Sequence, residues 1–145
     1  MKIYCTILFC CAMVMCSIAQ KDAIENKWLT AEKTSKVEIY KAIDGNFYGK
    51  VVWLKEPNLK NGQPKTDQNN KDEKLRHHSI MGLLILKKFK KTATPNVYEE
   101  GTVYDPNNGK TYCGTLTIEE KTLKLRGYIC GLSWLGRSSI WTLAD

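Results

Sequence analysis

The sequence predicts an all-β fold, a single antiparallel up-and-down β-barrel of about eight strands. Apolar residues alternate with polar ones along most of the chain, which is the period of a half-buried strand. Turn residues (Gly, Asn, Asp and Pro) recur at regular short intervals, and strong helical periodicity is absent. Many short strands joined by tight turns form a sandwich or a closed barrel, and we expect the barrel.

The first nineteen residues have the features of a secretory signal peptide. Lys2 supplies a positive charge, and an apolar run follows from residue 3 to residue 15. Ser17 and Ala19 are small residues at positions −3 and −1 of a cut before Gln20. A membrane span needs about 20 apolar residues, so this run is too short to be one.

We therefore expect a signal peptide at 1–19 and one domain at 20–145. The product would be exported to the periplasm or outside the cell and would not span a membrane once the signal is cleaved. Two alternatives remain: an uncleaved anchor, and a lipid on Cys16, which the preceding Met15 disfavours. Removing the signal changes the net charge from +7 to +6. This charge favours anionic partners such as envelope polysaccharide or lipid headgroups, although it also serves solubility.

The first half of the domain predicts four strands. A short strand at 28–30 comes first, and strands at 37–43 and 47–54 form a hairpin around Asp44-Gly45. Residues 55–78 make a polar connection that is unusually long for a compact domain. A strand at 80–89 follows, although its continuous apolar run also fits a turn of buried helix.

The second half predicts four more strands, at 97–104, 110–118, 123–130 and 137–143. The first two are joined by a Pro- and Gly-containing turn at 105–109. The next two are joined by 119–122, and a connection bounded by glycines at 131–136 leads to the last strand.

Two cysteines remain after removal of the signal, Cys113 and Cys130. If Ile118 faces Leu123 across the 119–122 turn, Cys113 lies opposite Tyr128 and Cys130 is its diagonal neighbour. Diagonal Cα atoms are about 7–8 Å apart, slightly beyond disulfide reach. A bulge or a shift of register would allow the bond, and two partly buried free thiols are the alternative.

Metal ligands and catalytic motifs are sparse. His77 and His78 are adjacent, so in a strand they would point to opposite faces, and we expect a solvated pair. The acidic stretch from 67 to 73 offers oxygen ligands, but its spacing is not that of an EF-hand calcium loop. We expect no metal and no cofactor.

An enzyme is the less favoured class, because the sequence contains no nucleophile elbow, phosphate loop or dinucleotide fingerprint. A carboxylate pair could still be assembled from Glu99, Glu100 and Asp105.

Aromatic and arginine side chains are concentrated in or beside the predicted strands. A barrel of eight strands has room for packed side chains or for one small ligand. Two arrangements fit: the rings fill the barrel, with the arginines paired or at its rim, or the rings line a pocket. If there is a pocket, we expect it or its rim to be formed by Arg76, Tyr104, Tyr112, Arg126, Tyr128 and Arg137.

Three stretches of the sequence follow a known family pattern. The first is Val51-Val52-Trp53-Leu54-Lys55 with Asp67-x-x-Asn70-x-Asp72-x-x-Leu75-Arg76 and Gly82-Leu83. The second is Gly101-x-Val103-Tyr104-Asp105-Pro106-x-x-Gly109-Lys110-Thr111-Tyr112. The third is Leu125-Arg126-Gly127-Tyr128-Ile129, Leu135-Gly136-Arg137 and Trp141. In this order they resemble the DUF2147 family over nearly the whole domain.

The resemblance implies a small exported bacterial protein with a lipocalin-like β-barrel and no established activity. Our leading hypothesis is thus a non-catalytic envelope barrel that binds a small amphipathic or anionic ligand. One alternative is a protein or glycan interaction module that uses the basic surface and the 55–78 loop. The other is an enzyme acting on envelope glycan or lipid. Export argues against nucleic acid as a partner.

Overall fold

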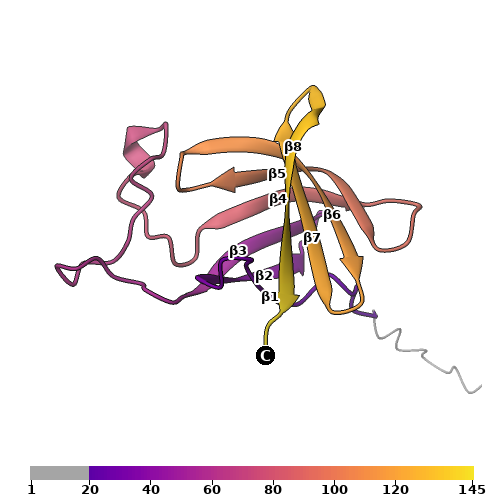
Figure 1. Cartoon of the computed structure of the whole chain (residues 1–145), viewed down its shortest axis with the longest axis horizontal. Helices are drawn as coiled ribbons and strands as arrows, with labels where there is room; N and C mark the ends of the chain where they lie inside the picture. Colours follow the sequence, from indigo (N-terminus) through magenta and orange to yellow (C-terminus); the bar gives the residue numbers. More distant parts are fainter. Residues whose placement is uncertain (1–19) are drawn as a thin grey trace, which may run out of the picture.

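The computed structural model describes residues 20–145, so the expected signal peptide and four of the six cysteines lie outside the described residues. Residues 20–145 form a closed antiparallel barrel in which eight strands follow one another in chain order (Figure 1). The predicted all-β, up-and-down fold is confirmed. The strands are β1 (Lys27–Leu29), β2 (Ser35–Lys41), β3 (Phe47–Leu54), β4 (Leu84–Lys91), β5 (Val97–Asp105), β6 (Lys110–Glu119), β7 (Thr122–Ile129) and β8 (Leu132–Leu143).

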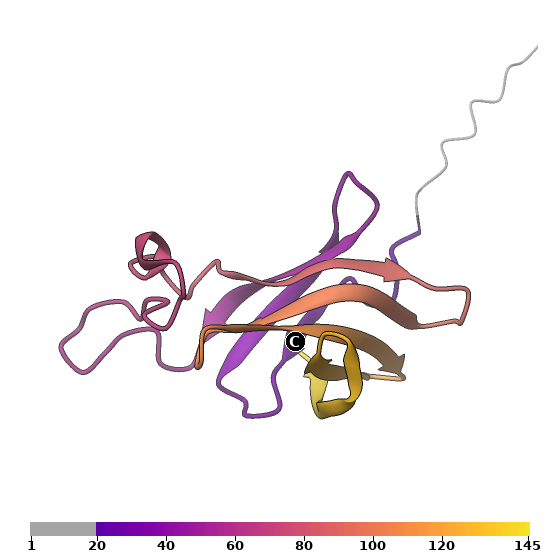
Figure 2. The same ribbon diagram turned by 90° about the horizontal axis from the view of Figure 1, so that it is seen from above.

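The two ends of the barrel differ in what connects the strands. Because neighbouring strands run in opposite directions, successive connections alternate between the ends. We call one end the mouth; it carries the connections 30–34, 55–83, 106–109 and 130–131. The other, the closed end, carries the short turns 42–46, 92–96 and 120–121 and the segments 20–26 and 144–145. In Figures 1 and 2 the 55–83 loop, with its short 3-10 helix η1 (Glu73–Leu75), stands out from the barrel.

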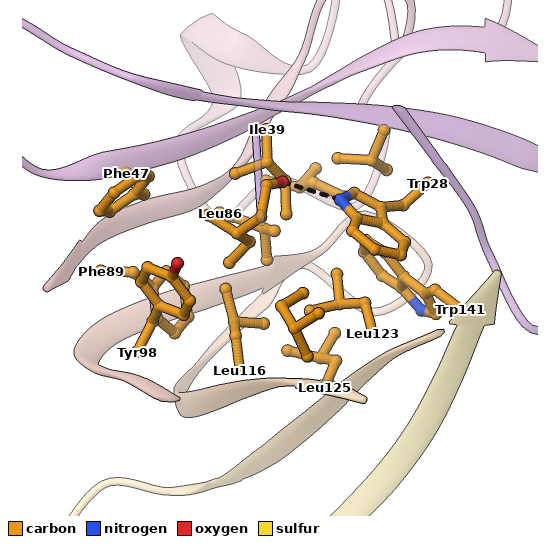
Figure 3. Packing of buried hydrophobic residues seen from close by; sticks show 14 of the residues in the cluster. Trp28, Ile39, Phe47, Leu86, Phe89, Tyr98, Leu116, Leu123, Leu125 and Trp141 are labelled. Carbon is orange, nitrogen blue, oxygen red and sulfur yellow. Dashed lines mark hydrogen bonds between the residues drawn. The ribbon is translucent and has the colours of Figure 1, made fainter. Parts of the chain in front are cut away.

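The closed half of the barrel is filled by apolar side chains (Figure 3). Alternate residues of each strand point inward, and those nearest the closed end are almost completely buried. The Trp28 indole nitrogen donates to the carbonyl of Ile24 at 2.9 Å, so the segment before β1 closes this end. The core consists of Ile24, Trp28, Val37, Ile39, Phe47, Val51, Ile85, Leu86, Phe89, Tyr98, Leu116, Ile118, Leu123, Leu125 and Trp141.

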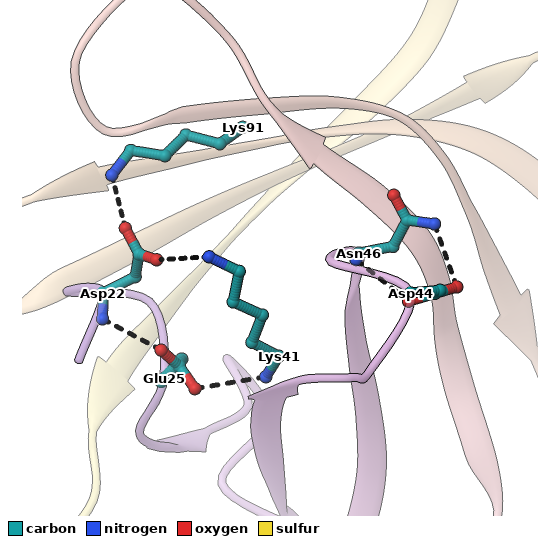
Figure 4. A network of polar contacts seen from close by, with 6 residues as sticks. All are labelled: Asp22, Glu25, Lys41, Asp44, Asn46 and Lys91. Atoms are coloured by element: carbon teal, nitrogen blue, oxygen red, sulfur yellow. Dashed lines mark hydrogen bonds and ion pairs between the residues drawn. The ribbon is translucent and has the colours of Figure 1, made fainter. Parts of the chain in front are cut away.

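A polar network ties the same segment to the strands around it (Figure 4). The Asp22 carboxylate pairs with the ammonium groups of Lys91 and Lys41. The Glu25 carboxylate accepts from the backbone N–H of Lys41 at 3.1 Å. The hydrogen bond between Lys91 and Asp22 lowers the pKa of the Asp22 carboxyl and raises the pKa of the Lys91 ammonium. The network joins the start of the described chain to β2 and β4.

Several predicted strand limits are wrong, and three of them change which residues lie in the sheet. The last strand begins at Leu132 rather than Arg137, because Gly131, at φ +86°, completes the turn alone. β4 begins at Leu84 rather than at residue 80, because positive φ at Gly82 ends the preceding loop there. Ile43, expected on the apolar face of a strand, is fully exposed because β2 ends at Lys41.

Cys113 and Cys130 form a disulfide, which decides between the two alternatives that the sequence left open. The predicted register is confirmed: Ile118 pairs with Leu123, and Cys113 pairs with Tyr128. However, β7 ends at Ile129, so Cys130 leaves the strand in the turn to β8 and approaches β6. The Cα atoms of Cys113 and Cys130 are 5.1 Å apart, within disulfide reach.

The seam that closes the barrel is short. Within residues 20–145, β1 and β8 share two residue pairs, Trp28 with Leu143 and Leu29 with Thr142. The N–H of Ala144 adds a bond to the carbonyl of Lys27. Most of β8, from Leu132 to Trp141, therefore pairs with β7 alone.

Candidate ligand site at the mouth

All six residues predicted from the sequence lie in the mouth half of the barrel, but the structure divides them into separate groups. Arg76 lies within the 55–83 loop and bonds to its backbone, and Tyr104 of β5 bonds to the same loop. Arg126 and Tyr128 alternate with the inward-facing Leu125 and Gly127 of β7, so they face outward. Tyr112 and Arg137 share the inward face, as described below.

The 55–83 loop is organised around one buried carboxylate. Asp67 is 1% exposed, and it accepts hydrogen bonds from the Tyr104 hydroxyl and from the Asn70 side-chain amide, both at 2.7 Å. Its backbone N–H donates to the carbonyl of His78 at 2.9 Å, which joins the two arms of the loop. The Asp67 carboxylate oxygens, which the sequence suggested as possible metal ligands, therefore accept hydrogen bonds that hold the loop together.

The bond to Asp67 also fixes the chemical state of Tyr104. Burial, together with the hydrogen bond to the Asp67 carboxylate, raises the pKa of Tyr104 to about 12. The phenol therefore stays protonated at neutral pH and acts as a hydrogen-bond donor. The protonated phenol of Tyr104 therefore links β5 to the 55–83 loop and is a poor proton acceptor.

The same loop is docked on the turn between β5 and β6. The Asn69 side-chain amide donates to the carbonyls of Pro106 and Asn107, at 3.1 and 3.0 Å. Gly109 has φ +65°, and a Cβ there would lie 1.8 Å from the carbonyl oxygen of Asn69. Arg76 stabilises the loop from within, because its Nε donates to the carbonyl of Asn70 at 2.8 Å. The loop is therefore a fixed wall beside the mouth.

Arg126 and Tyr128 shape the hairpin of β7 and β8. The register shifts after the pair of Tyr128 with Gly136, and the next pair is Ile129 with Leu132, so 133–135 bulge out of β8. The Arg126 guanidinium donates to the carbonyl of Ser133 in this bulge at 2.9 Å. Tyr128 stands beside Cys113 on the outer face. These contacts set the shape of the hairpin.

Room remains at the mouth around Gly127. The inward glycines Gly49, Gly101 and Gly114 are covered, since a Cβ there would meet Leu86 or Phe89 within 3.0 Å. At Gly127, by contrast, a Cβ would meet among the described residues only the Cβ of Tyr112, at 3.9 Å. The space that a side chain would fill at this inward position is therefore open.

A cation and an aromatic ring border this opening. Arg137 pairs with Gly127, and both lie on the inward face that continues from Leu125. The Arg137 side chain is exposed and makes no hydrogen bond or ion pair within residues 20–145. Tyr112 pairs with the inward-facing Val103, and its hydroxyl accepts from the Asn108 amide at 3.1 Å. Tyr112, Gly127 and Arg137 form what we call the mouth site.

Two hollows of the described surface lie at the closed end. One, of about 660 Å³, is an open depression lined by Glu119, Glu120, Lys121 and Thr122 of a single turn. The other, of about 310 Å³, lies between the segment before β1 and β2 and is lined largely by charged and polar residues.

The described residues do not assemble the other sites that the sequence raised. His77 and His78 are exposed, with ring centroids 4.6 Å apart, and residues 20–145 contain no cluster of three or more metal-ligating side chains. Glu99 and Glu100 lie near the start of β5, whereas Asp105 ends it. No helix in this part of the chain has the length and apolarity to span a membrane.

Sequence reasoning did not single out Gly127, or Asp67 and Asn69 as loop anchors. Gly127 lies between two predicted residues, Arg126 and Tyr128, and an inward glycine on a strand is a recognisable sign of close approach or of space. The role of Asn69 depends on two segments distant in the chain, so no local pattern indicates it.

Comparison with known proteins identifies the family and the fold. Residues 26–143 match the model of a family described as uncharacterized protein conserved in bacteria (DUF2147). A solved structure, that of protein HP1028 from Helicobacter pylori, is described as belonging to the lipocalin family. It is similar with a TM-score of 0.74 at 22% identity, over 86% of this chain and 84% of that one. No curated protein matches significantly. The chain is a member of the DUF2147 family, and its barrel is lipocalin-like.

Proposed function

We propose that this protein is an exported envelope barrel that binds a small amphipathic or anionic ligand at the mouth site. The observation that carries the proposal is the open inward position at Gly127 beside the guanidinium of Arg137, which is exposed and has no ion-pair partner among residues 20–145. The signal-like pattern of residues 1–19 supports export. The lipocalin-like fold supports binding, because barrels of this size can hold one small ligand.

The ligand has to be small, or has to leave part of itself outside. The closed half of the barrel is occupied by Trp28, Phe89 and Trp141, so an apolar chain can enter only the mouth half. There Arg137 offers a charge-assisted bond to a carboxylate, sulfate or phosphate headgroup. The ring of Tyr112 offers apolar contact on the opposite side of Gly127.

The other four predicted residues support the site from outside it. Arg76 and Tyr104 hold the loop that borders the mouth, and Arg126 and Tyr128 hold the hairpin that carries Arg137. Because the loop is tied to the β5–β6 turn by Asn69, it is better suited to be a wall of the site than a free arm for a partner protein.

Calorimetric titration with decyl sulfate, decanoate and the neutral decyl maltoside tests the proposal. We expect the two anions to bind more tightly than the maltoside, and Arg137→Gln to weaken anion binding by about tenfold, the loss of one charge-assisted bond. Gly127→Leu should remove binding by filling the opening. Lys124→Gln is the matched control, because it removes an exposed cation from the outer face of β7.

Two results would contradict the mouth site. Equal weakening by Lys124→Gln and Arg137→Gln would show that only net charge matters. Unchanged binding by Gly127→Leu, with the barrel still folded, would place the ligand elsewhere.

A further inference from the structure

The turn between β7 and β8 presents large apolar side chains to solvent. Ile129 is 50% exposed, Leu132 39%, Trp134 73% and Leu135 42%. These four residues lie within seven positions at one end of a hairpin, and we call them the hydrophobic tip. Single exposed apolar residues are common, but a contiguous group marks an interaction surface.

The tip is held in shape by contacts at its base. The disulfide between Cys113 and Cys130 ties the turn to β6. Arg126 holds the bulge through the carbonyl of Ser133. A Cβ at Gly136 would lie 2.7 Å from the carbonyl oxygen of Gly127, so the two strands are tightly packed just below the tip. The apolar side chains are therefore displayed by a rigid hairpin, which projects at the top of Figure 1.

The charge around the tip indicates what covers it. From Leu125 to Leu143 the hairpin contains two basic residues, Arg126 and Arg137, and no acidic residue. A second copy of the chain would bring like charges together at this hairpin, which is unfavourable. A projecting apolar tip flanked by cations instead complements a surface that is soft, apolar inside and negative outside. An anionic lipid bilayer has these properties.

We propose that the hydrophobic tip docks this protein peripherally on anionic lipid membranes. Trp134 enters the boundary between headgroups and acyl chains, where tryptophan is favoured, and Ile129, Leu132 and Leu135 enter with it. Arg126, on the outer face of β7, lies next to the lipid phosphates. The docking surface is distinct from the mouth site, because its exposed apolar side chains lie beyond Gly127 and Arg137, toward the end of the hairpin.

Vesicle co-sedimentation tests this inference. We expect the mature protein to bind vesicles of phosphatidylcholine mixed with phosphatidylglycerol, to bind phosphatidylcholine alone more weakly, and to dissociate as salt is raised. The double variant Leu132→Ser/Trp134→Ser should bind at least about tenfold more weakly, because two buried apolar side chains are lost. Ile43→Ser is the matched control, since Ile43 is a fully exposed apolar residue at the closed end.

A second measurement reports on the tip without a disruptive substitution. Lipids brominated on their acyl chains should quench part of the tryptophan fluorescence of the bound wild-type protein, and Trp134→Phe should remove that quenching while binding is kept. The proposal is overturned if the double variant and Ile43→Ser bind vesicles equally well, or if the quenching persists in Trp134→Phe. It is also overturned if the protein ignores vesicles and instead forms a dimer that the double variant abolishes.

Discussion

The two ends of the barrel are built on different physical terms. The closed end is filled by large apolar side chains and covered by the segment that carries Ile24 and Asp22. The mouth is held by specific polar contacts, a disulfide and glycines that allow close approach, and it leaves apolar surface exposed. We therefore infer that stability depends mainly on the closed end, and we expect ligand recognition at the mouth. Changes at the closed end should affect folding, and changes at the mouth should affect local shape and binding.

Truncation of a core tryptophan should produce the largest effect. Trp28→Ala removes a ring that is 1% exposed and its bond to Ile24, so we expect a loss of about 3–5 kcal/mol in unfolding free energy. Trp134→Ala, at the mouth, should change it by no more than about 0.5 kcal/mol. Urea denaturation measures both. Similar losses of unfolding free energy in the two variants would show that the closed end and the mouth do not differ in their contribution to stability.

Removal of the disulfide should come next. Cys113→Ser/Cys130→Ser opens a loop with a sequence separation of 17 residues, which should cost about 3 kcal/mol. Because the bond lies at the mouth, hydrogen exchange should accelerate most in the turn around Gly131 and least around Leu116. Uniform acceleration throughout the barrel would mean that the bond supports the whole fold equally.

Substitutions at two glycines of the mouth distinguish the cost of backbone strain from the cost of a steric collision. Gly109→Ala combines a positive φ with a collision with Asn69, and we expect it to cost about 2 kcal/mol or more. Gly131→Ala, also at positive φ but with nothing within 4 Å, should cost only about 1 kcal/mol. Thermal unfolding gives both values. Equal costs would indicate that the loop does not press on the turn.

Loss of the Tyr104 hydroxyl should have a smaller effect that depends on pH. Tyr104→Phe leaves Asp67 with one hydrogen bond fewer, at a cost of about 1–2 kcal/mol at neutral pH. The pKa of Tyr104 is raised from 10.0 to about 12, so its proton stabilises the fold fully below pH 10, and this contribution is lost as pH rises through about 12. The difference between wild type and variant should shrink over that interval in denaturant titrations. A constant difference would contradict it.

The carboxylate of Asp22 at the closed end should make stability depend on pH in the acidic range, with the smallest effect of the series. The pKa of Asp22 is lowered from 3.8 by its bond to Lys91, so its contribution is present above that value and disappears as pH falls below it. Asp22→Asn should therefore lower stability near neutral pH by less than about 1 kcal/mol and cause no loss in acid. Glu99→Gln, an exposed carboxyl near the same end, is the control. Equal pH profiles for both variants would contradict a special role for Asp22.

What the sequence could predict follows from which interactions are local. Alternation and turn residues give the strand order, and across the 119–122 turn they give the register of Ile118 with Leu123. The disulfide escaped prediction because it depends on where β7 ends, which a run from Leu123 to Cys130 does not reveal. The start of β8 escaped because Leu132–Gly136 reads as a loop, although pairing with β7 and the bulge at 133–135 keep it in the sheet.

The candidate site was predicted less completely than the fold. Arg137 and Tyr112 follow from residue type and strand position, but the opening between them depends on which inward glycines are covered by distant side chains. Gly101 and Gly127 are indistinguishable in the sequence. Only the packing of Phe89 over Gly101 separates a filled position from an open one.

The short seam between β1 and β8 has a consequence for how the barrel is made. The pairs of Trp28 with Leu143 and Leu29 with Thr142 join residues more than a hundred positions apart, whereas the other ladders join neighbours in the chain. Hairpins can form as the polypeptide emerges, but the ring cannot shut until Ala144 is free to bond with Lys27. A chain cut after Trp141 would lose both seam pairs and only one pair of the β7–β8 ladder, Thr122 with Thr142. It would persist as an open sheet, with two bare edges available for aggregation.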